Sequence, residues 1–144
     1  MTWYQPTPDS HAHRGMVHRG QVSTACNATF VMTFRSRRLD DDPPDHQVCP
    51  RCDLSPQERH DRAALVAVRA GDITKQGDRY VHRLVALRAA SPMDAALLRL
   101  AAGGKVTAEN QRGVVAVRTT DAGDARYELL DQRLRNAAAA GFQP

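Results

Sequence analysis

The feature that most constrains this chain is a pair of cysteines two residues apart, Cys49 and Cys52, in a sequence that holds only one other cysteine, Cys26. A CxxC pair serves as a redox couple or as half of a metal site. A redox pair needs its cysteines at the start of a helix that follows a buried strand. Here prolines interrupt the segment on both sides, at Pro44 and Pro50, so the context favours a metal site.

A metal would also supply stability that the core lacks. The chain has 144 residues, of which 42% are hydrophobic and only 5% are aromatic. Many of the hydrophobic residues are alanine, and large apolar side chains provide most of the stabilisation from burial. Small folds with a thin core commonly depend on a structural metal.

Zinc requires four ligands in a tetrahedral arrangement, typically thiolates and imidazoles. Cys26, Cys49 and Cys52 provide three, so the fourth must be a histidine. His18 lies eight residues before Cys26, in a short extended stretch that can turn back at residues 19–21. His46 is the competitor, but it lies three residues before Cys49, where it would crowd the backbone. We therefore favour His18.

The residues between these ligands predict a β-hairpin. Residues 27–38 alternate in polarity and are rich in β-branched and aromatic residues, as in a strand. The acidic and proline-rich residues 40–45 predict a turn, and residues 46–48 a short returning strand. The sequence thus predicts a zinc-binding β-hairpin module at 14–54, with residues 1–13, including His11 and His13, as a flexible N-terminal arm.

The chain resembles small His/Cys3 zinc-binding, zinc-ribbon-like proteins of actinobacteria and their phages. The resemblance lies in the order of His18, Cys26 and the CxxC pair that follows Val48. The resemblance covers residues 17–54 and implies one structural zinc at His18, Cys26, Cys49 and Cys52. The chain departs from the usual form at Asn27, where a glycine commonly follows the first cysteine, and in a longer hairpin. The resemblance implies little about function.

The second half of the chain, 55–144, contains an internal repeat. Residues 62–81 and 94–114 share an Ala-Ala-Leu motif and an alanine-glycine helix end, which indicates a duplicated unit, 56–90 and 92–143. Each copy predicts a helix that starts at a Ser-Pro pair, Ser55 and Ser91, followed by a hairpin and a second helix, at 83–90 and at 127–142 after a loop at 121–125. The predicted class is α+β, with a weak similarity to winged-helix-like modules.

The net charge of +4 and the excess of arginine over lysine are compatible with phosphate contacts, although a GC-rich genome also enriches arginine. Asp40, Asp41 and Asp42 are alternative partners for the nearby arginines. Phe30 and Phe34 are expected in the core, which argues against single-strand binding. The candidate nucleic-acid-binding residues are Arg35, Arg37, Arg38, Lys75, Arg79 and Arg83.

We expect no catalysis, because three cysteines and one histidine leave a zinc ion no open position for water. No apolar run is long enough for a membrane span or resembles a signal peptide, so a cytoplasmic protein without a membrane partner is expected. The sequence favours a non-catalytic, nucleic-acid-associated or regulatory protein. The alternative is a protein-interaction adaptor, such as a phage protein that binds a host complex.

Overall fold

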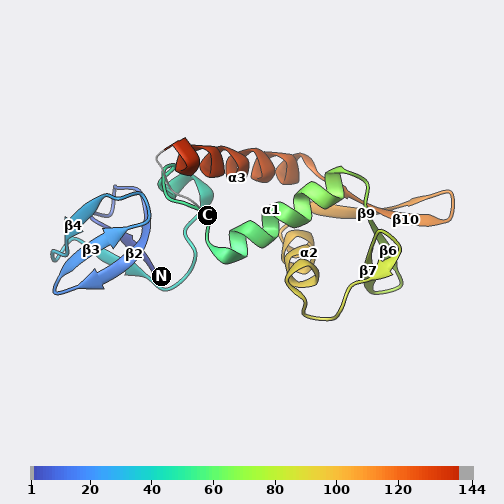
Figure 1. Ribbon diagram of the computed structural model, residues 1–144, viewed down its shortest axis with the longest axis horizontal. Helices are drawn as coiled ribbons and strands as arrows, with labels where there is room; N and C mark the ends of the chain where they lie inside the picture. The colour runs from blue at the N-terminus through green and yellow to red at the C-terminus, as the bar shows by residue number, and fades with distance from the viewer. Residues whose placement is uncertain (1, 140–144) are drawn as a thin grey trace. The chain divides into compact units, whose positions relative to one another are not determined.

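The computed structural model describes residues 2–139, which form an α+β structure with two antiparallel sheets (Figure 1). The chain divides into two compact units. The described residues of the first unit are 2–53 and 132–139, and the second unit consists of residues 54–131. The predicted α+β class is confirmed.

The first unit is built on a sheet with the strand order β4-β3-β2-β1-β5. Its strands are β1 (Thr2–Gln5), β2 (His13–His18), β3 (Gln21–Thr24), β4 (Thr29–Val31) and β5 (Arg37–Leu39). Consecutive strands from β1 to β4 pair with one another, and β5 returns to pair with the free side of β1. The strand predicted over residues 27–38 is therefore two short strands separated by a turn.

Residues 2–13 do not form the flexible arm that the sequence predicted for residues 1–13, and residue 1 lies outside the described part of the chain. Residues 2–5 form β1, which is paired on both sides, and Trp3 and Tyr4 are buried. The physical reason is that aromatic residues favour a pleated, half-buried surface, and a chain with few large apolar groups places these two in its core. The predicted strand at 46–48 is also wrong, because residues 45–47 form a short 3-10 helix, η1 (Asp45–Gln47).

The core of the first unit is small. Trp3, Ala12 and Val48 form one buried cluster, against which Leu39 packs. A second cluster joins Ala25 with the three cysteines, of which Cys49 and Cys52 are buried. The cysteines thus make up most of one of these two clusters, which fits the expectation of a thin core.

The second unit combines a sheet with helices. Its elements are α1 (Pro56–Arg69), β6 (Ile73–Gln76), β7 (Arg79–His82), β8 (Val85–Ala86), α2 (Pro92–Ala102), β9 (Val106–Gln111), β10 (Val114–Thr119) and the first part of α3 (Asp121–Ala139). The strand order is β8-β7-β6-β10-β9. The two helix–hairpin units therefore share one sheet, which the pairing of β6 with β10 completes.

The two predicted helix starts are confirmed. Ser55 accepts a hydrogen bond from the backbone N–H of Glu58, whose side chain accepts one from the backbone N–H of Ser55, forming a capping box. Ser91 accepts the equivalent bond from the N–H of Asp94. Proline occupies the first turn of both helices, where its missing N–H costs nothing.

The helix predicted at 83–90 is absent. Arg83 and Leu84 adopt positive φ angles of 49° and 72°, and the turn they form returns residues 85–86 to pair with β7. A tight β-turn therefore overrides the apolar pattern of this segment. The predicted loop at 121–125 is instead the start of α3, where the Thr120 hydroxyl accepts a hydrogen bond from the N–H of Gly123.

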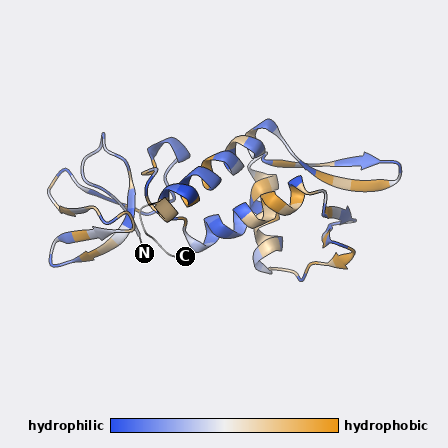
Figure 2. Cartoon of the chain, turned by 45° about the horizontal axis from the view of Figure 1, so that its top comes forward, coloured by the Kyte–Doolittle hydropathy of each residue, from blue (hydrophilic) through white to orange (hydrophobic). Residues whose placement is uncertain are grey.

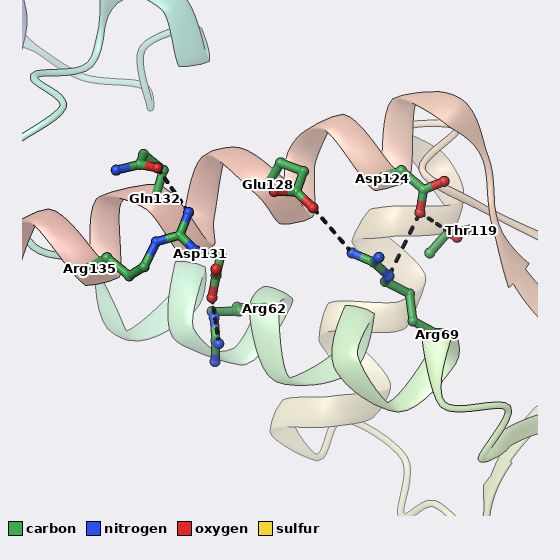
Figure 3. Close-up of polar contacts among 8 residues, drawn as sticks. All are labelled: Arg62, Arg69, Thr119, Asp124, Glu128, Asp131, Gln132 and Arg135. Carbon is green, nitrogen blue, oxygen red and sulfur yellow. Dashed lines mark hydrogen bonds and ion pairs between the residues drawn. The ribbon is translucent and has the colours of Figure 1, made fainter.

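Helices α1 and α3 carry many hydrophilic residues, whereas α2 is largely hydrophobic (Figure 2). Ion pairs join α1 to the part of α3 that belongs to the second unit (Figure 3). Arg62 binds Asp131 at 2.8 Å, and Arg69 lies 3.8 Å from Glu128 and 4.0 Å from Asp124. Within residues 2–139, none of the helices is long and apolar enough to cross a membrane.

Candidate metal centre

Four side chains converge in the first unit: His13, Cys26, Cys49 and Cys52. Their possible ligand atoms all lie within 4.8 Å of one another. They come from three separate segments of the chain: the start of β2, the turn between β3 and β4, and the segment after η1. Such convergence of soft ligands indicates a site that can hold a metal ion.

The histidine of this cluster is His13, not the predicted His18. His18 is exposed at the opposite end of β2. It lies about 16 Å from His13 along the strand, since each residue advances about 3.3 Å, and an odd separation places the two side chains on opposite faces. His46 is exposed in η1 and also lies outside the cluster.

The β2–β3 hairpin explains why His13 faces Cys26. The strands are joined by a two-residue turn in which Arg19 and Gly20 have positive φ angles of 50° and 77°, as in the type I′ turns that suit hairpins. In the resulting register His18 pairs with Gln21, and Gly15 pairs with Thr24. Two residues further from the turn than the Gly15–Thr24 pair, His13 lies opposite Cys26.

Cys26 is presented by the turn between β3 and β4. The N–H of Asn27 donates to the carbonyl of Thr24, and the N–H of Thr24 donates to the carbonyl of Ala28. Asn27 closes this turn with a φ of 62°. Asparagine is one of the few residues other than glycine that readily adopt this left-handed conformation, so Asn27 suits this position of the turn.

The CxxC segment is attached to the same end of the sheet. Ala12 and Val48 form a parallel β-bridge. The N–H of Cys49 donates to the carbonyl of Ala12, which places Cys49 beside His13, and the N–H of Cys52 donates to the carbonyl of Cys49 to close a tight turn. This turn brings the two thiols to one side of the segment.

Two sulfur–nitrogen separations in the cluster fit tetrahedral coordination. The Sγ atoms of Cys26 and Cys52 lie 3.4 Å and 3.8 Å from Nδ1 of His13. Ligand bonds of about 2.3 Å to sulfur and about 2.0 Å to nitrogen require sulfur–nitrogen separations of about 3.5 Å. All three cysteines are free thiols, and burial of two of them limits access of water to the site.

The surroundings of the cluster favour the ionised form of two of its three thiols. A hydrogen bond from Cys52 lowers the pKa of the Cys49 thiol to about 3. The same bond and burial raise the pKa of Cys52. Burial alone would raise the pKa of Cys26, but hydrogen bonds from Thr24, the N–H of Ala28 and His13 lower it overall. Thiols must ionise to bind a metal, and these contacts favour the ionised form at two of them.

A second layer of contacts supports the CxxC segment. Arg133, in the part of α3 that belongs to the first unit, is buried and donates to the carbonyls of Cys52 at 3.3 Å and Asp53 at 3.2 Å. Arg14 donates to the carbonyl of Asp53 at 3.1 Å, and Asn136 to that of Pro50 at 2.9 Å. Such contacts orient ligands and are themselves important for metal affinity.

The predicted nucleic-acid-binding residues fall into two groups. Arg35, Arg37 and Arg38 belong to the first unit and are exposed, whereas the others belong to the second unit. In the second unit, Lys75, Arg79 and Arg83 each make an internal contact. Arg83 pairs with Asp72 at 3.1 Å, Arg79 donates to the carbonyl of Leu87, and Lys75 lies over the ring of Tyr80.

The expectation that both phenylalanines lie in the core is wrong for Phe34, whose exposed fraction is 98%. It belongs to a turn at 33–36, where alternation along a strand no longer applies. Phe30 is partly buried, and its ring lies 6.3 Å from that of His13.

The fold and the site together show that this is an α+β protein with a His/Cys3 cluster that can hold a metal ion. Comparison with protein-family models, with curated proteins and with solved structures finds no match.

Proposed function

We propose that this is a non-catalytic zinc-binding protein, in which one structural zinc organises a surface that contacts nucleic acid. The observation that carries the zinc assignment is the convergence of His13, Cys26, Cys49 and Cys52, with all ligand atoms within 4.8 Å of one another. Three thiolates and one imidazole complete a tetrahedral zinc site. No position is left for a reacting water, which supports a structural role.

The nucleic-acid role is supported by the arginines of the first unit. Arg35, Arg37 and Arg38 are exposed, and across residues 2–139 none of the three forms an ion pair. The neighbouring Asp42 instead accepts a hydrogen bond from Nε1 of Trp3 at 3.0 Å. Guanidinium groups that are not neutralised internally are available to bind phosphates.

In the second unit, α2 followed by the hairpin of β9 and β10 has the order of elements found in winged-helix-like modules. This order supports the proposal, but the basic residues predicted there already have internal partners. We therefore assign the principal phosphate contacts to the first unit.

Fluorescence anisotropy with labelled oligonucleotides at 50 and 200 mM salt tests this proposal. Neutralising three phosphates of a single strand gives a slope of log affinity against log salt of about −2, which corresponds to about 20-fold weaker binding at the higher salt. Changing both Arg37 and Arg38 to Gln should reduce the slope by about 1.4. The matched control changes Arg88 and Arg112, which are exposed elsewhere, and should leave the slope unchanged.

A protein-interaction adaptor is the second candidate. It is favoured by the turn between β7 and β8 and the strand that follows, where Leu84 and Val85 are 98% and 69% exposed. Exposed apolar side chains on a tight turn suit a protein partner. Binding through such residues would depend little on salt, and Leu84→Ala would weaken it while the arginine variants would not.

A further inference from the structure

The turn at residues 33–36 presents an aromatic ring to solvent from a well-ordered backbone. The N–H of Thr33 donates to Oγ of Ser36 at 2.9 Å, and the N–H of Ser36 donates to the carbonyl of Thr33 at 3.0 Å. The N–H of Arg35 donates to Oγ1 of Thr33 at 3.2 Å. The Ser36 hydroxyl then ties the turn to the carbonyl of Pro6 at 3.0 Å. Phe34, 98% exposed, is thus held on a hydrogen-bonded turn.

This placement is unusual for the composition of the chain. The sequence has three phenylalanines, and burial of a phenyl ring is among the largest single contributions a small core can receive. Phe34 makes no such contribution. An aromatic ring kept in solvent by an ordered turn is available to a binding partner.

The charges around the ring indicate what kind of partner fits. Arg35 follows Phe34 directly, and Arg37 and Arg38 belong to β5, an edge strand of the sheet. Successive residues of a strand point to opposite faces, so Arg37 and Arg38 project on the two sides of this edge. Arg35 lies in the turn and Arg37 and Arg38 lie in the strand that follows it, so three exposed guanidinium groups come within four residues of Phe34.

We propose that this turn and edge strand bind single-stranded nucleic acid, with one base stacked on Phe34 and the adjacent phosphates bound by Arg35, Arg37 and Arg38. The inference rests on the proposed nucleic-acid role and specifies its ligand. An aromatic ring flanked by cationic groups is the arrangement used for single strands. A protruding ring can stack only on a base that has a free face. Inside a duplex both faces of each base are covered by neighbouring bases, so a single strand fits this ring better.

The experiment measures binding of a labelled 12-nucleotide oligothymidylate and a duplex of mixed sequence by fluorescence anisotropy. Phe34→Ala should weaken single-strand binding about 5-fold to 100-fold, because it removes one base–aromatic stack. Phe34→Leu should lose as much single-strand affinity as Phe34→Ala, because leucine is apolar but has no ring on which a base can stack. Phe34→Trp should retain the affinity. The matched control is Leu84→Ala, since Leu84 is also 98% exposed, and it should bind like the unmodified protein.

The outcomes separate this inference from the proposed function. Tighter binding of the single strand, lost in Phe34→Ala and kept in Phe34→Trp, supports both. Duplex binding at least as tight as single-strand binding, unchanged in Phe34→Ala, overturns the inference and leaves the nucleic-acid role standing. If neither oligonucleotide binds, both are overturned, and the arginines act only to prevent pairing of the edge strand with other chains. Metal content and circular dichroism confirm that each variant is folded.

Discussion

His13 and Cys26 face each other across the β2–β3 hairpin, with Nδ1 of the imidazole 3.4 Å from Sγ of the cysteine. The turn at Arg19 and Gly20 determines this relationship, because it sets the register in which the two strands pair. The geometry of the His/Cys3 cluster therefore depends on a turn that contributes none of its four side chains.

Removing His13 should remove the metal. His13→Ala leaves three ligands, and the affinity for zinc should fall by more than about 100-fold, beyond the loss typical of supporting residues. His18→Ala is the matched control, since it changes a histidine of the same strand that lies outside the cluster. Native mass spectrometry should find one zinc per chain in the control and none in His13→Ala. The reverse result would assign the site to His18.

This histidine could have been identified from the sequence. An Arg-Gly pair between two β-prone runs is compatible with a two-residue hairpin turn, and such a turn at residues 19–20 pairs residue 13 with residue 26. Spacing along the chain favours His18, whereas the register of the two strands brings His13 to Cys26. Identifying the three cysteines needed only residue types, whereas choosing the histidine needed the geometry of the hairpin.

Metal removal should unfold the first unit and spare the second. The thiols form most of one of the two buried clusters described for the first unit, and free thiolates in that position would repel one another. Hydrogen exchange measured after chelation should show loss of protection in β1 to β4, while α1 and α2 stay protected. Unchanged protection in β2 and β3 would show that the sheet is stable without metal.

Arg133 should stabilise the metal site without contacting the metal. Arg133→Ala leaves the carbonyls of Cys52 and Asp53 without this donor, at a cost of about 2 kcal/mol in unfolding free energy and about 10-fold or more in zinc affinity. Arg135→Ala is the control on the same helix, because Arg135 is exposed and donates to the side chain of Gln132. Chemical denaturation and a competitive zinc titration measure the two effects. Equal behaviour of the two variants would contradict the role of Arg133.

Asn27 should tolerate glycine but not a β-branched residue. Its φ of 62° suits glycine, so Asn27→Gly should change the unfolding free energy by less than about 0.5 kcal/mol. Asn27→Val should cost about 2 kcal/mol, because a β-branched residue is strained in this conformation, and it should displace Cys26. Thermal unfolding and metal content of both variants test this. A stable, zinc-loaded Asn27→Val would show that the turn does not require the left-handed conformation.

Local signals predicted the second unit better than the first. The capping residues Ser55 and Ser91 fix two helix starts through contacts within four residues, which sequence can reveal. Trp3 and Leu39 are neighbours only because β5 returns to β1, and no local pattern encodes that pairing. The helix expected at 83–90 failed for a different reason, since a local hairpin replaces it: β8 pairs with β7 across the turn at Arg83 and Leu84.

The buried carboxylate Asp61 should be the most important polar residue of the second unit. Its side chain is 8% exposed and accepts a hydrogen bond from Arg99 at 2.6 Å, with Arg126 at 3.9 Å. Asp61→Ala removes the central anion between two cations, which should cost about 3 kcal/mol. Asp72→Ala breaks an ion pair whose arginine is 73% exposed, and it should cost less than about 1 kcal/mol. Urea denaturation followed by circular dichroism compares the two variants. Similar midpoints would mean that the Asp61 network contributes no more than a surface ion pair.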